Sequence, residues 1–241
     1  ALAFNTMADS LEQSEQRRQE FIANVSHELK TPMTTIGGYV DGILDGTIPK
    51  ENEKHYLQIV SSEVRRLSRL VRSMLDLSRI QAQGVDESRK TRFDLGEAMG
   101  DVLITFEQKI NTRGLQVNVD MPEKPVWTKA DRDAITQVIY NLLDNAIKFC
   151  PVGGSLGLIL EQDGQKARLH VRNTGPTIPP EELPLVFERF HKADKARSAD
   201  REGWGLGLYI AKTIVGAHGG EISASSENGV TDFSFTLPAV R

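Results

Sequence analysis

Two stretches in the first third of the chain carry apolar residues at alternating steps of three and four, and this spacing constrains the fold more than any other feature. It is the spacing of an apolar seam on a helix packed in a bundle. The turn residues of DGTIPKEN (45–52) lie between the stretches and predict the end of the first helix. Two helices of about 30 residues cannot bury both seams as an isolated hairpin, so we expect two hairpins to pair into a four-helix dimer. The first seam consists of Ile22, Val25, Leu29, Pro32, Ile36, Tyr39 and Ile43, and the second of Leu57, Val60, Val64, Leu67, Val71 and Met74.

The composition is that of an ordinary globular protein and excludes several classes. The chain has 241 residues, of which 39% are hydrophobic and 26% charged. Its net charge of -4 gives no sign of nucleic-acid binding, and no basic cluster is interleaved with aromatic residues. The single cysteine, Cys150, excludes an internal disulfide framework and fits a reducing compartment. No apolar run approaches the roughly 18 residues of a membrane span, and no secretory signal opens the chain, so we expect a soluble piece.

The beginning of the chain, ALAFNTMADSLEQ, has the pattern of the middle of a helix, so we expect a fragment of a longer protein. Phe4, Ala8 and Leu11 continue the first seam, but Glu15 and Arg18 occupy its next two positions. The segment EQSEQRRQE is therefore either a solvated helical face or a weak joint in a long helix, and the sequence leaves both open.

The pattern changes from QAQGVDESRKTRFDL onward, where Gly84 and its polar neighbours indicate a linker. We expect helices near 95–113, 131–149 and 206–218. Strands are expected near 115–120, 125–129, 155–162, 166–173, 220–225 and 230–237. The region 174–205 is rich in proline, glycine and charge. Helices and strands in mixed order predict a two-layer α/β domain after the helical hairpin.

His27, in FIANVSHELKTPMTTI (21–36), is one of only five histidines and lies two residues from both Val25 and Leu29. At the helical turn of about 100° per residue it is about 200° from each, which places it on the outer face of the first helix. No partner at ligand spacing beyond Glu28 supports a metal site. A surface histidine without a role stays open, but Pro32 removes a helical amide nearby and indicates a functional site. A neutral imidazole can act as a nucleophile, with Glu28 as its proton partner.

Polar residues of the second domain have the chemistry of a nucleotide site. Asn141, Asn145 and Lys148 share one stripe of QVIYNLLDNAIKF, where amide oxygens suit Mg²⁺ and a lysine suits phosphate. In GWGLGLYIAKTI (203–214), glycines directly precede a helix, whose N-terminal amides favour an anion. The charged segment FERFHKADKARSADRE is either a disordered loop or a mobile lid over phosphates. Together, the polar stripe, the charged segment and the glycines before a helix favour a triphosphate-binding site over an ordinary solvated face.

Five stretches carry a resemblance that covers nearly the whole chain. FIANVSHELKTP resembles the phosphoacceptor box of sensor histidine kinases, and NLLDNAIKF resembles their N-box. FERF and GWGLGL are similar to their phenylalanine box and second glycine box, and AFNTMADSLEQSEQRR resembles the end of a HAMP signal-relay module. The resemblance implies a multidomain protein: an all-α hairpin that forms a four-helix-bundle dimer, followed by an α/β two-layer sandwich of the Bergerat type. It divides the chain into a HAMP-like end (1–20), a dimerisation and phosphoacceptor hairpin (21–82), a linker (83–91) and an ATP-binding catalytic domain (92–241).

The resemblance also implies roles for single residues. His27 would accept the γ-phosphoryl group of ATP, Glu28 would be its acid/base partner, and Thr31 would position water when the enzyme acts as a phosphatase. Asn145 would hold Mg²⁺ near Asn141. The nucleotide would further contact Lys148, Phe149, Asn173, Gly175, Gly203, Gly205, Leu206 and Gly207.

The implied activity is autophosphorylation of His27 by Mg²⁺-ATP, followed by transfer to an aspartate of a response regulator. The implied partners are a second copy of the chain and that regulator, with no direct nucleic acid. The chain would be the cytoplasmic portion of a membrane-bound sensor, held at the membrane only through upstream segments absent from this chain. Two alternatives stay open: a non-catalytic dimeric module that binds nucleotide and relays conformation, and a partner-directed phosphatase with feeble kinase activity.

One stretch departs from the family pattern. The first glycine box of the family usually has Asp-x-Gly-x-Gly, whereas here the sequence is NTGPT, with Asn173 for the acid and Thr177 for the second glycine. An asparagine oxygen still accepts a hydrogen bond from the adenine amino group, but the contact is uncharged and weaker. We therefore expect ATP binding to be retained and weaker.

Overall fold

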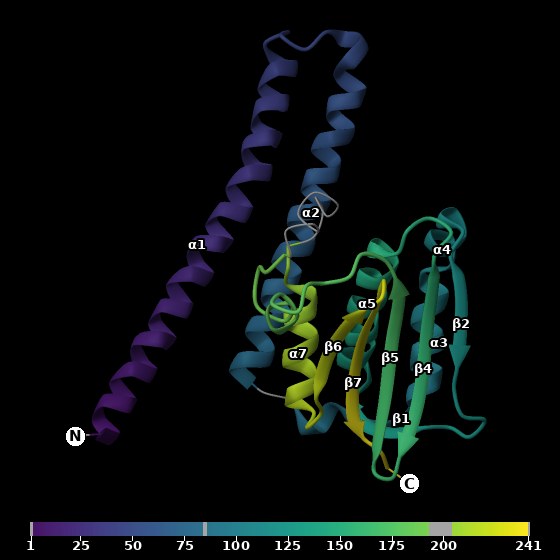
Figure 1. Ribbon diagram of the computed structural model, residues 1–241. Helices are drawn as coiled ribbons and strands as arrows, with labels where there is room; N and C mark the ends of the chain where they lie inside the picture. The colour runs from purple at the N-terminus through teal and green to yellow at the C-terminus, as the bar shows by residue number, and fades with distance from the viewer. Residues whose placement is uncertain (1, 84–85, 193–203, 241) are drawn as a thin grey trace. The chain divides into compact units, whose positions relative to one another are not determined.

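The computed structural model describes residues 2–83, 86–192 and 204–240 (Figure 1). The chain divides into two compact units, Ala1–Met74 and Leu75–Arg241, and the long helix α2 belongs partly to each. None of the helices in the described ranges combines the length and the apolar character that a membrane crossing requires.

The first unit is a helical hairpin of α1 (Leu2–Leu44) and α2 (Lys50–Gln83). α1 is continuous through both Pro32 and the segment EQSEQRRQE, and it ends where the turn residues predicted. The later part of its seam faces α2: Pro32 is buried, and the Tyr39 ring lies 4.9 Å from that of Tyr56, whereas Ile22 is exposed. The hairpin covers only part of the predicted second seam, because Leu57, Val64 and Val71 remain 46–50% exposed.

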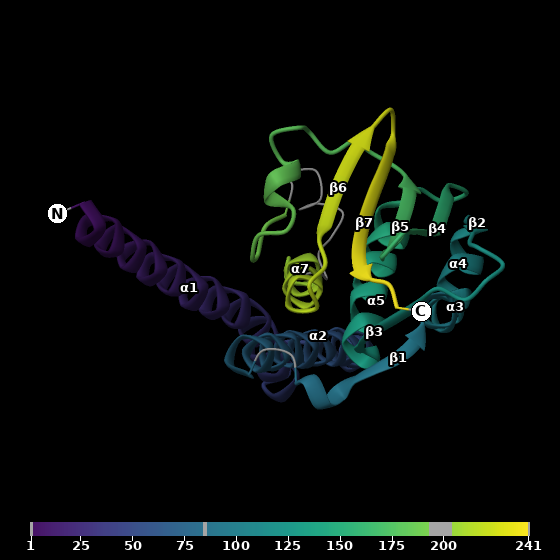
Figure 2. The ribbon, with the colours of Figure 1, turned by 90° about the horizontal axis from the view of Figure 1, so that it is seen from below.

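The second unit is a five-stranded sheet with helices on one face (Figures 1 and 2). The strand order is β2-β4-β5-β7-β6, with β2 parallel to β4 and the other pairs antiparallel. Asn228 and Gly229 join β6 to β7 with φ angles of 51° and 76°, as a tight hairpin turn of type I′ requires. The strands are β2 (Gln116–Asp120), β4 (Ser155–Asp163), β5 (Lys166–Thr174), β6 (Ile222–Glu227) and β7 (Val230–Pro238).

Buried and exposed residues alternate along the central strands, and the buried ones form the core of this unit. Every second residue of β5 is fully buried, at Ala167, Leu169 and Val171, while the residues between them face away from the helices. This apolar face packs against α5 (Arg132–Phe149) and α7 (Gly207–Ala217), whose own buried residues recur at helical spacing. Short 3₁₀ turns lie at Glu87–Arg89 (η1) and Leu183–Leu185 (η2).

The helical hairpin followed by an α/β unit confirms the predicted fold class, but two local expectations were wrong. The single helix expected at 95–113 is divided into α3 (Leu95–Thr105) and α4 (Glu107–Arg113), because the chain turns at buried Phe106, whose ring packs 4.7 Å from Tyr140. A strand that the sequence did not indicate, β1 (Lys90–Asp94), pairs antiparallel with β3 (Trp127–Asp131) in a separate two-stranded sheet.

Candidate functional site

His27 lies on the exposed outer face of α1, as the phase of the seam predicted, and Glu28 beside it is half-buried. The Thr31 hydroxyl donates to the His27 carbonyl at 3.3 Å, and the Thr35 hydroxyl donates to the Thr31 carbonyl at 3.1 Å. Both are bonds from a threonine to the carbonyl four residues earlier, and neither reaches the Glu28 carbonyl, whose helical donor would be the N–H that Pro32 lacks. The helix nevertheless continues past the proline and presents the imidazole to solvent.

The stripe predicted on α5 is formed, since Asn141, Asn145 and Lys148 are all half-buried on one helix. Asp131 begins this helix: its Oδ1 accepts from the amides of Asp133 and Ala134 at 3.1 and 3.3 Å. The helix ends at Phe149, before Cys150 and Pro151. The Lys148 ammonium lies 5.7 Å from the centre of the Phe149 ring, so the cation and the aromatic ring are neighbours at the end of the helix.

The structure joins this stripe to the predicted glycine segment (203–214), of which residues 204–214 are described. Asn141 Nδ2 donates to the Gly207 carbonyl at 3.1 Å, and Gly207 is the first residue of α7. Leu206, directly before it, is buried. Gly205 has a φ of 67°, which favours glycine. Two segments more than 60 residues apart therefore meet with the polar side of α5 facing the start of α7.

The FERF segment lies against the same glycines. The Phe190 amide donates to the Gly205 carbonyl at 3.0 Å, and Phe190 itself has a φ of 59°, which is uncommon outside glycine. Phe187 is buried and meets the Phe233 ring of the core edge to face at 6.1 Å. The Arg189 guanidinium donates to the Tyr209 hydroxyl of α7 at 2.6 Å. The segment is thus anchored to the core and to α7. The rest of the predicted lid (193–202) and Gly203 lie outside the described residues.

The NTGPT segment is held on both sides. Asn173 is buried at the end of β5, and its Nδ2 donates to the Thr174 carbonyl at 3.0 Å. A Cβ at Gly175 would lie 2.7 Å from the Phe149 carbonyl, so this glycine permits close contact between β5 and the end of α5. Thr177, which replaces a family glycine, accepts a hydrogen bond from the Gly229 amide at 3.1 Å. The threonine at this position therefore has a structural role, because it fixes the NTGPT segment to the β6–β7 turn.

Sequence reasoning missed His218, which ends α7 and is buried. Its Nδ1 lies 2.8 Å from the Ile214 carbonyl, and its Nε2 lies 3.2 Å from the amide of Asp131. Burial is the main cause that lowers its pKa below the usual 6.5. The sequence signal was a histidine at the end of a largely apolar helix, directly before two glycines.

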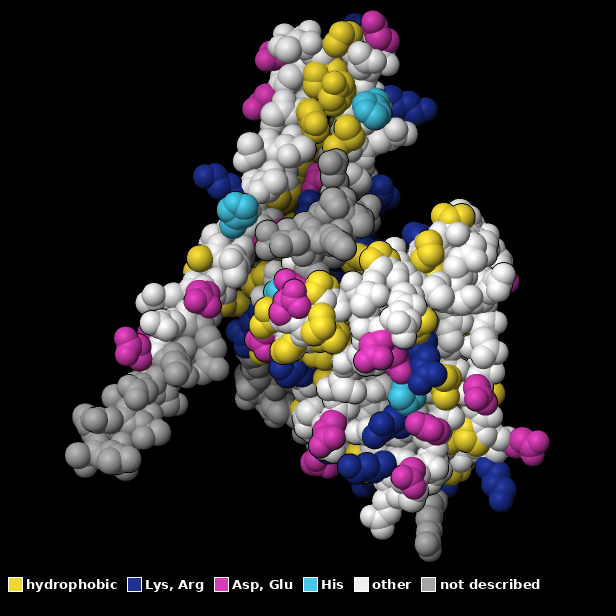
Figure 3. Space-filling model, in the orientation of Figure 1, with side chains coloured by type: hydrophobic (Ala, Val, Ile, Leu, Met, Phe, Trp, Pro, Cys, Tyr) yellow, Lys and Arg dark blue, Asp and Glu magenta, His cyan; other side chains and the backbone are white. Residues whose placement is uncertain are grey.

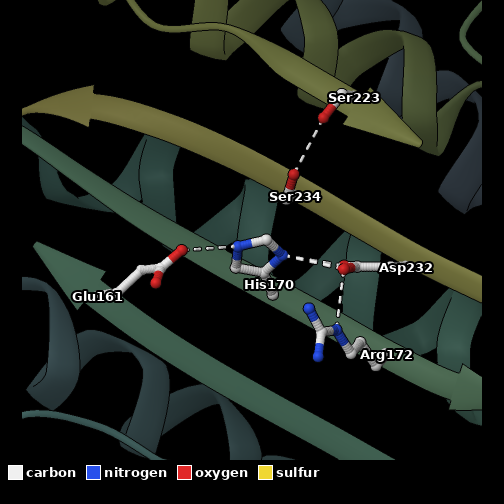
Figure 4. Close-up of polar contacts among 6 residues, drawn as sticks. All are labelled: Glu161, His170, Arg172, Ser223, Asp232 and Ser234. Carbon is white, nitrogen blue, oxygen red and sulfur yellow. Dashed lines mark hydrogen bonds and ion pairs between the residues drawn. The ribbon is translucent and has the colours of Figure 1, made fainter. Parts of the chain in front are cut away.

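Another histidine, His170, belongs to a polar cluster on the sheet face opposite the helices (Figure 4). His170 is held between Asp232, 3.0 Å from Nδ1, and Glu161, 3.1 Å from Nε2. Arg172 donates to Asp232 at 2.8 Å. These contacts join β4, β5 and β7 through their outward side chains, which is the usual way that cross-strand pairs stabilise a sheet. This cluster is separate from the candidate site.

Two family models match the chain. The model described as "His Kinase A (phospho-acceptor) domain" matches residues 17–83, and the model described as "Histidine kinase-, DNA gyrase B-, and HSP90-like ATPase" matches residues 130–241. Sensor protein SrrB of Staphylococcus aureus (strain MRSA252) is 37% identical over 226 residues, which are 93% of this chain and 38% of SrrB. The chain therefore spans well under half the length of this relative.

Two solved structures of a histidine kinase are similar. The nucleotide-free catalytic domain of histidine kinase ThkA is 31% identical, with a TM-score of 0.57 over 62% of this chain and 95% of that domain. The complex of ThkA with the response regulator protein TrrA gives 28% identity and a TM-score of 0.76, over 96% of this chain and 66% of the ThkA chain.

Proposed function

Because this chain belongs to the sensor histidine kinases, we propose that its α/β unit binds ATP and that His27 accepts the γ-phosphoryl group. The hydrogen bond from Asn141 to Gly207 carries this proposal most directly. It brings Asn141, the first residue of the α5 stripe, to the start of α7, where main-chain amides favour an anion. A solvent-facing imidazole on α1 supplies the acceptor. We further propose that the hairpin (21–82) and the catalytic domain (92–241) are the working parts, joined by residues 83–91.

The reaction would be an in-line displacement at phosphorus. A lone pair of the His27 imidazole attacks the γ-phosphorus, an N–P bond forms, and the bond to the bridging oxygen breaks so that ADP leaves with that electron pair. Glu28, the next residue, takes or orients the proton of the other ring nitrogen. Positioning and electrostatics carry most of the catalysis, because the protein supplies little covalent chemistry beyond the nucleophile.

The donor groups present on α5 fit a magnesium ion. In the described parts of the chain no group of three or more His, Cys, Asp or Glu residues could hold a metal. The half-buried amide of Asn145 instead offers the kind of oxygen ligand that Mg²⁺ accepts while keeping most of its waters. When bound, the ion would neutralise charge on the phosphate oxygens. Lys148 would meet the phosphates as a point charge.

The test is incubation of the chain with Mg²⁺-ATP, followed by assay for phosphate that is labile in acid and stable in alkali. We expect label on the wild type, and none on His27→Ala or Asn145→Asp, both folded by circular dichroism. His55→Ala is the matched control, since His55 is also exposed on a helix of the same unit and should leave the labelling unchanged. An unlabelled wild type would refute the kinase proposal and favour a non-catalytic module, and label that survives His27→Ala would place the acceptor elsewhere.

A response regulator is the proposed recipient of the phosphoryl group. The ThkA structure with TrrA supports this class of partner. Leu29, Lys30 and Met33 help to line a shallow hollow on α1 that begins one residue from His27, and Met33 is 61% exposed. In the transfer, an aspartate oxygen of the regulator attacks phosphorus, the N–P bond breaks and neutral imidazole is restored. Loss of label from His27 on addition of a regulator, with gain on the regulator, is the expected result.

Thr31 supports a second activity, the removal of phosphate from the regulator. Its hydroxyl lies beside His27 on the same face of α1 and could orient a water molecule. Thr31→Ala should slow the dephosphorylation of a phosphorylated regulator and leave autophosphorylation of His27 within about twofold, because the hydroxyl takes no part in attack on ATP. Equal loss of both activities would instead indicate a structural role for Thr31.

We propose that the working form is a dimer of hairpins. Hydrophobic side chains gather along the hairpin near its turn (Figure 3). Leu57, Val64 and Val71 recur at seven-residue spacing on α2 and remain about half exposed in the single chain, which is the pattern of a helix that packs against another copy. The limited coverage of SrrB, a sensor protein by name, supports the further proposal that this chain is the cytoplasmic portion of a longer, membrane-bound sensor.

A further inference from the structure

His218 uses both of its ring nitrogens, although it lies outside the proposed nucleotide site. Nδ1 faces the Ile214 carbonyl at 2.8 Å and must therefore carry the hydrogen. Nε2 receives the Asp131 amide at 3.2 Å and must therefore offer its lone pair. Since the side chain is only 7% exposed, these two contacts fix one neutral tautomer of the imidazole.

The bond to Asp131 connects the two helices that carry the nucleotide site. Asp131 directly precedes α5, and His218 directly follows α7. A second polar connection between these helices is the bond from Asn141 to Gly207 at the start of α7. Both helices lie on the same face of the sheet (Figure 2). α7 is therefore fixed to α5 at each of its ends, which lie about 16 Å apart at 1.5 Å per residue.

Charged groups around the imidazole come from several elements. Asp131 contributes a carboxylate whose Oδ2 pairs with Arg89 Nε at 3.1 Å. Lys90 of β1 lowers the pKa of the imidazole and Glu87 of η1 raises it. These two side chains also pair with each other at 2.5 Å. Burial has the largest effect, and together these influences lower the pKa of His218. The neutral form is therefore the one present near pH 7.

We propose that His218, with Nε2 unprotonated, is a positioning residue for nucleotide binding: its bond to the Asp131 amide holds α7 so that residues 205–207 meet the polar side of α5. This inference rests on the proposed function of the α5–α7 site. A proton on Nε2 removes the acceptor and places two N–H groups against each other. The far end of α7 is then released, and nucleotide affinity falls although His218 touches no nucleotide.

The test measures the dissociation constant of Mg²⁺ with a non-hydrolysable ATP analogue by calorimetry at pH 7.5 and pH 5.5. His218→Gln keeps a carbonyl oxygen that can accept from the Asp131 amide and does not titrate. His218→Leu has a similar volume and no acceptor. His170→Gln is the matched control, because it removes a histidine from the opposite face of the sheet. Circular dichroism at each pH verifies that every protein is folded under the conditions of measurement.

From pH 7.5 to 5.5 we expect the affinity of the wild type and of His170→Gln to fall about fivefold more than that of His218→Gln, the effect of one lost hydrogen bond. The titration of the nucleotide itself is common to all proteins and cancels in this comparison. His218→Leu should bind about fivefold more weakly than the wild type already at pH 7.5.

Equal pH dependence of the wild type and His218→Gln would overturn the inference and leave the proposed function intact. Wild-type affinity in a folded His218→Leu would do the same, and if that variant does not fold, the glutamine comparison decides. Failure of the wild type to bind at pH 7.5 would overturn the proposed function, and this inference with it.

Discussion

Gly205 shows how narrowly a single residue of the site is constrained. Its φ is 67°, and a Cβ there would lie 2.7 Å from the His191 carbonyl oxygen and 2.8 Å from the Phe190 carbonyl carbon. Both neighbours are backbone atoms, so an alanine requires the loop itself to move. We expect Gly205→Ala to lower the free energy of unfolding by about 1–3 kcal/mol and to weaken binding of the ATP analogue roughly tenfold or more, since the start of α7 moves with it.

Gly216 provides the matched control for that change. It is exposed on α7, and a Cβ there would meet nothing within 4 Å. Because glycine costs a helix conformational entropy, Gly216→Ala should raise the free energy of unfolding by about 0.5–1 kcal/mol and leave nucleotide affinity unchanged. Urea unfolding and calorimetry give both quantities. A Gly205→Ala protein with wild-type affinity would show that this turn does not shape the site.

We expect Asn173→Asp to have two opposite effects, tighter binding of ATP and lower stability of the ligand-free protein. The change restores the acid usual in the family, and a charged acceptor forms hydrogen bonds about twice as strong as a neutral one, so ATP should bind several-fold more tightly. The same change removes the donor that reaches the Thr174 carbonyl at 3.0 Å and places a buried carboxylate there. The ligand-free protein should lose about 1–3 kcal/mol of stability. Weaker binding with unchanged stability would contradict both arguments.

The contact between α5 and α7 predicts how stability depends on pH. His218 is neutral when folded, and its pKa is lowered mainly by burial. The unfolded state, with a pKa near 6.5, therefore binds more protons below that pH, and the stabilisation present above it is lost as the pH falls toward the lowered value. Between pH 7 and pH 5 the wild type should lose about 0.5–1.5 kcal/mol more than His218→Gln in urea unfolding. A parallel decline in both proteins would show that other groups control acid stability.

The elements that the sequence predicted well are those whose side chains repeat with one period. α5 and α7 have an apolar line at helical spacing, and β5 alternates, so their bounds agree with the prediction within one or two residues; α1 ends directly before its predicted turn. β1 was missed because KTRFD buries only Phe93, and its partner strand begins more than 30 residues later. Phe106 divides a helix that periodicity predicts to be continuous, since its ring turns into the core. Contacts between residues far apart in the sequence leave no local pattern from which they could be predicted.

In the candidate site, too, the sequence predicted what lies on one helix but not the contacts between distant segments. Asn141, Asn145 and Lys148 could be grouped from the sequence because one helix orders them. The contact of Asn141 with Gly207, and of Asp131 with His218, joins positions 66 and 87 residues apart. Such bonds depend on how α5 and α7 cross the sheet. Motif resemblance brought the first pair together, whereas no motif considered from the sequence pointed to the second.

For the whole molecule, the decisive question is which surface of the hairpin a second copy covers. Val64 is 48% exposed and lies between Leu57 and Val71 on the uncovered line of α2. A glutamate there would bury a charge if two hairpins pair along this line, and an unpaired buried charge is strongly unfavourable. We expect Val64→Glu to change the mass in light scattering from that of a dimer to that of a monomer. Ser62→Glu, an exposed position on about the opposite side of the helix, should remain dimeric. If Val64→Glu also remains dimeric, the copies meet elsewhere, and the exposed line of α2 is left for another partner.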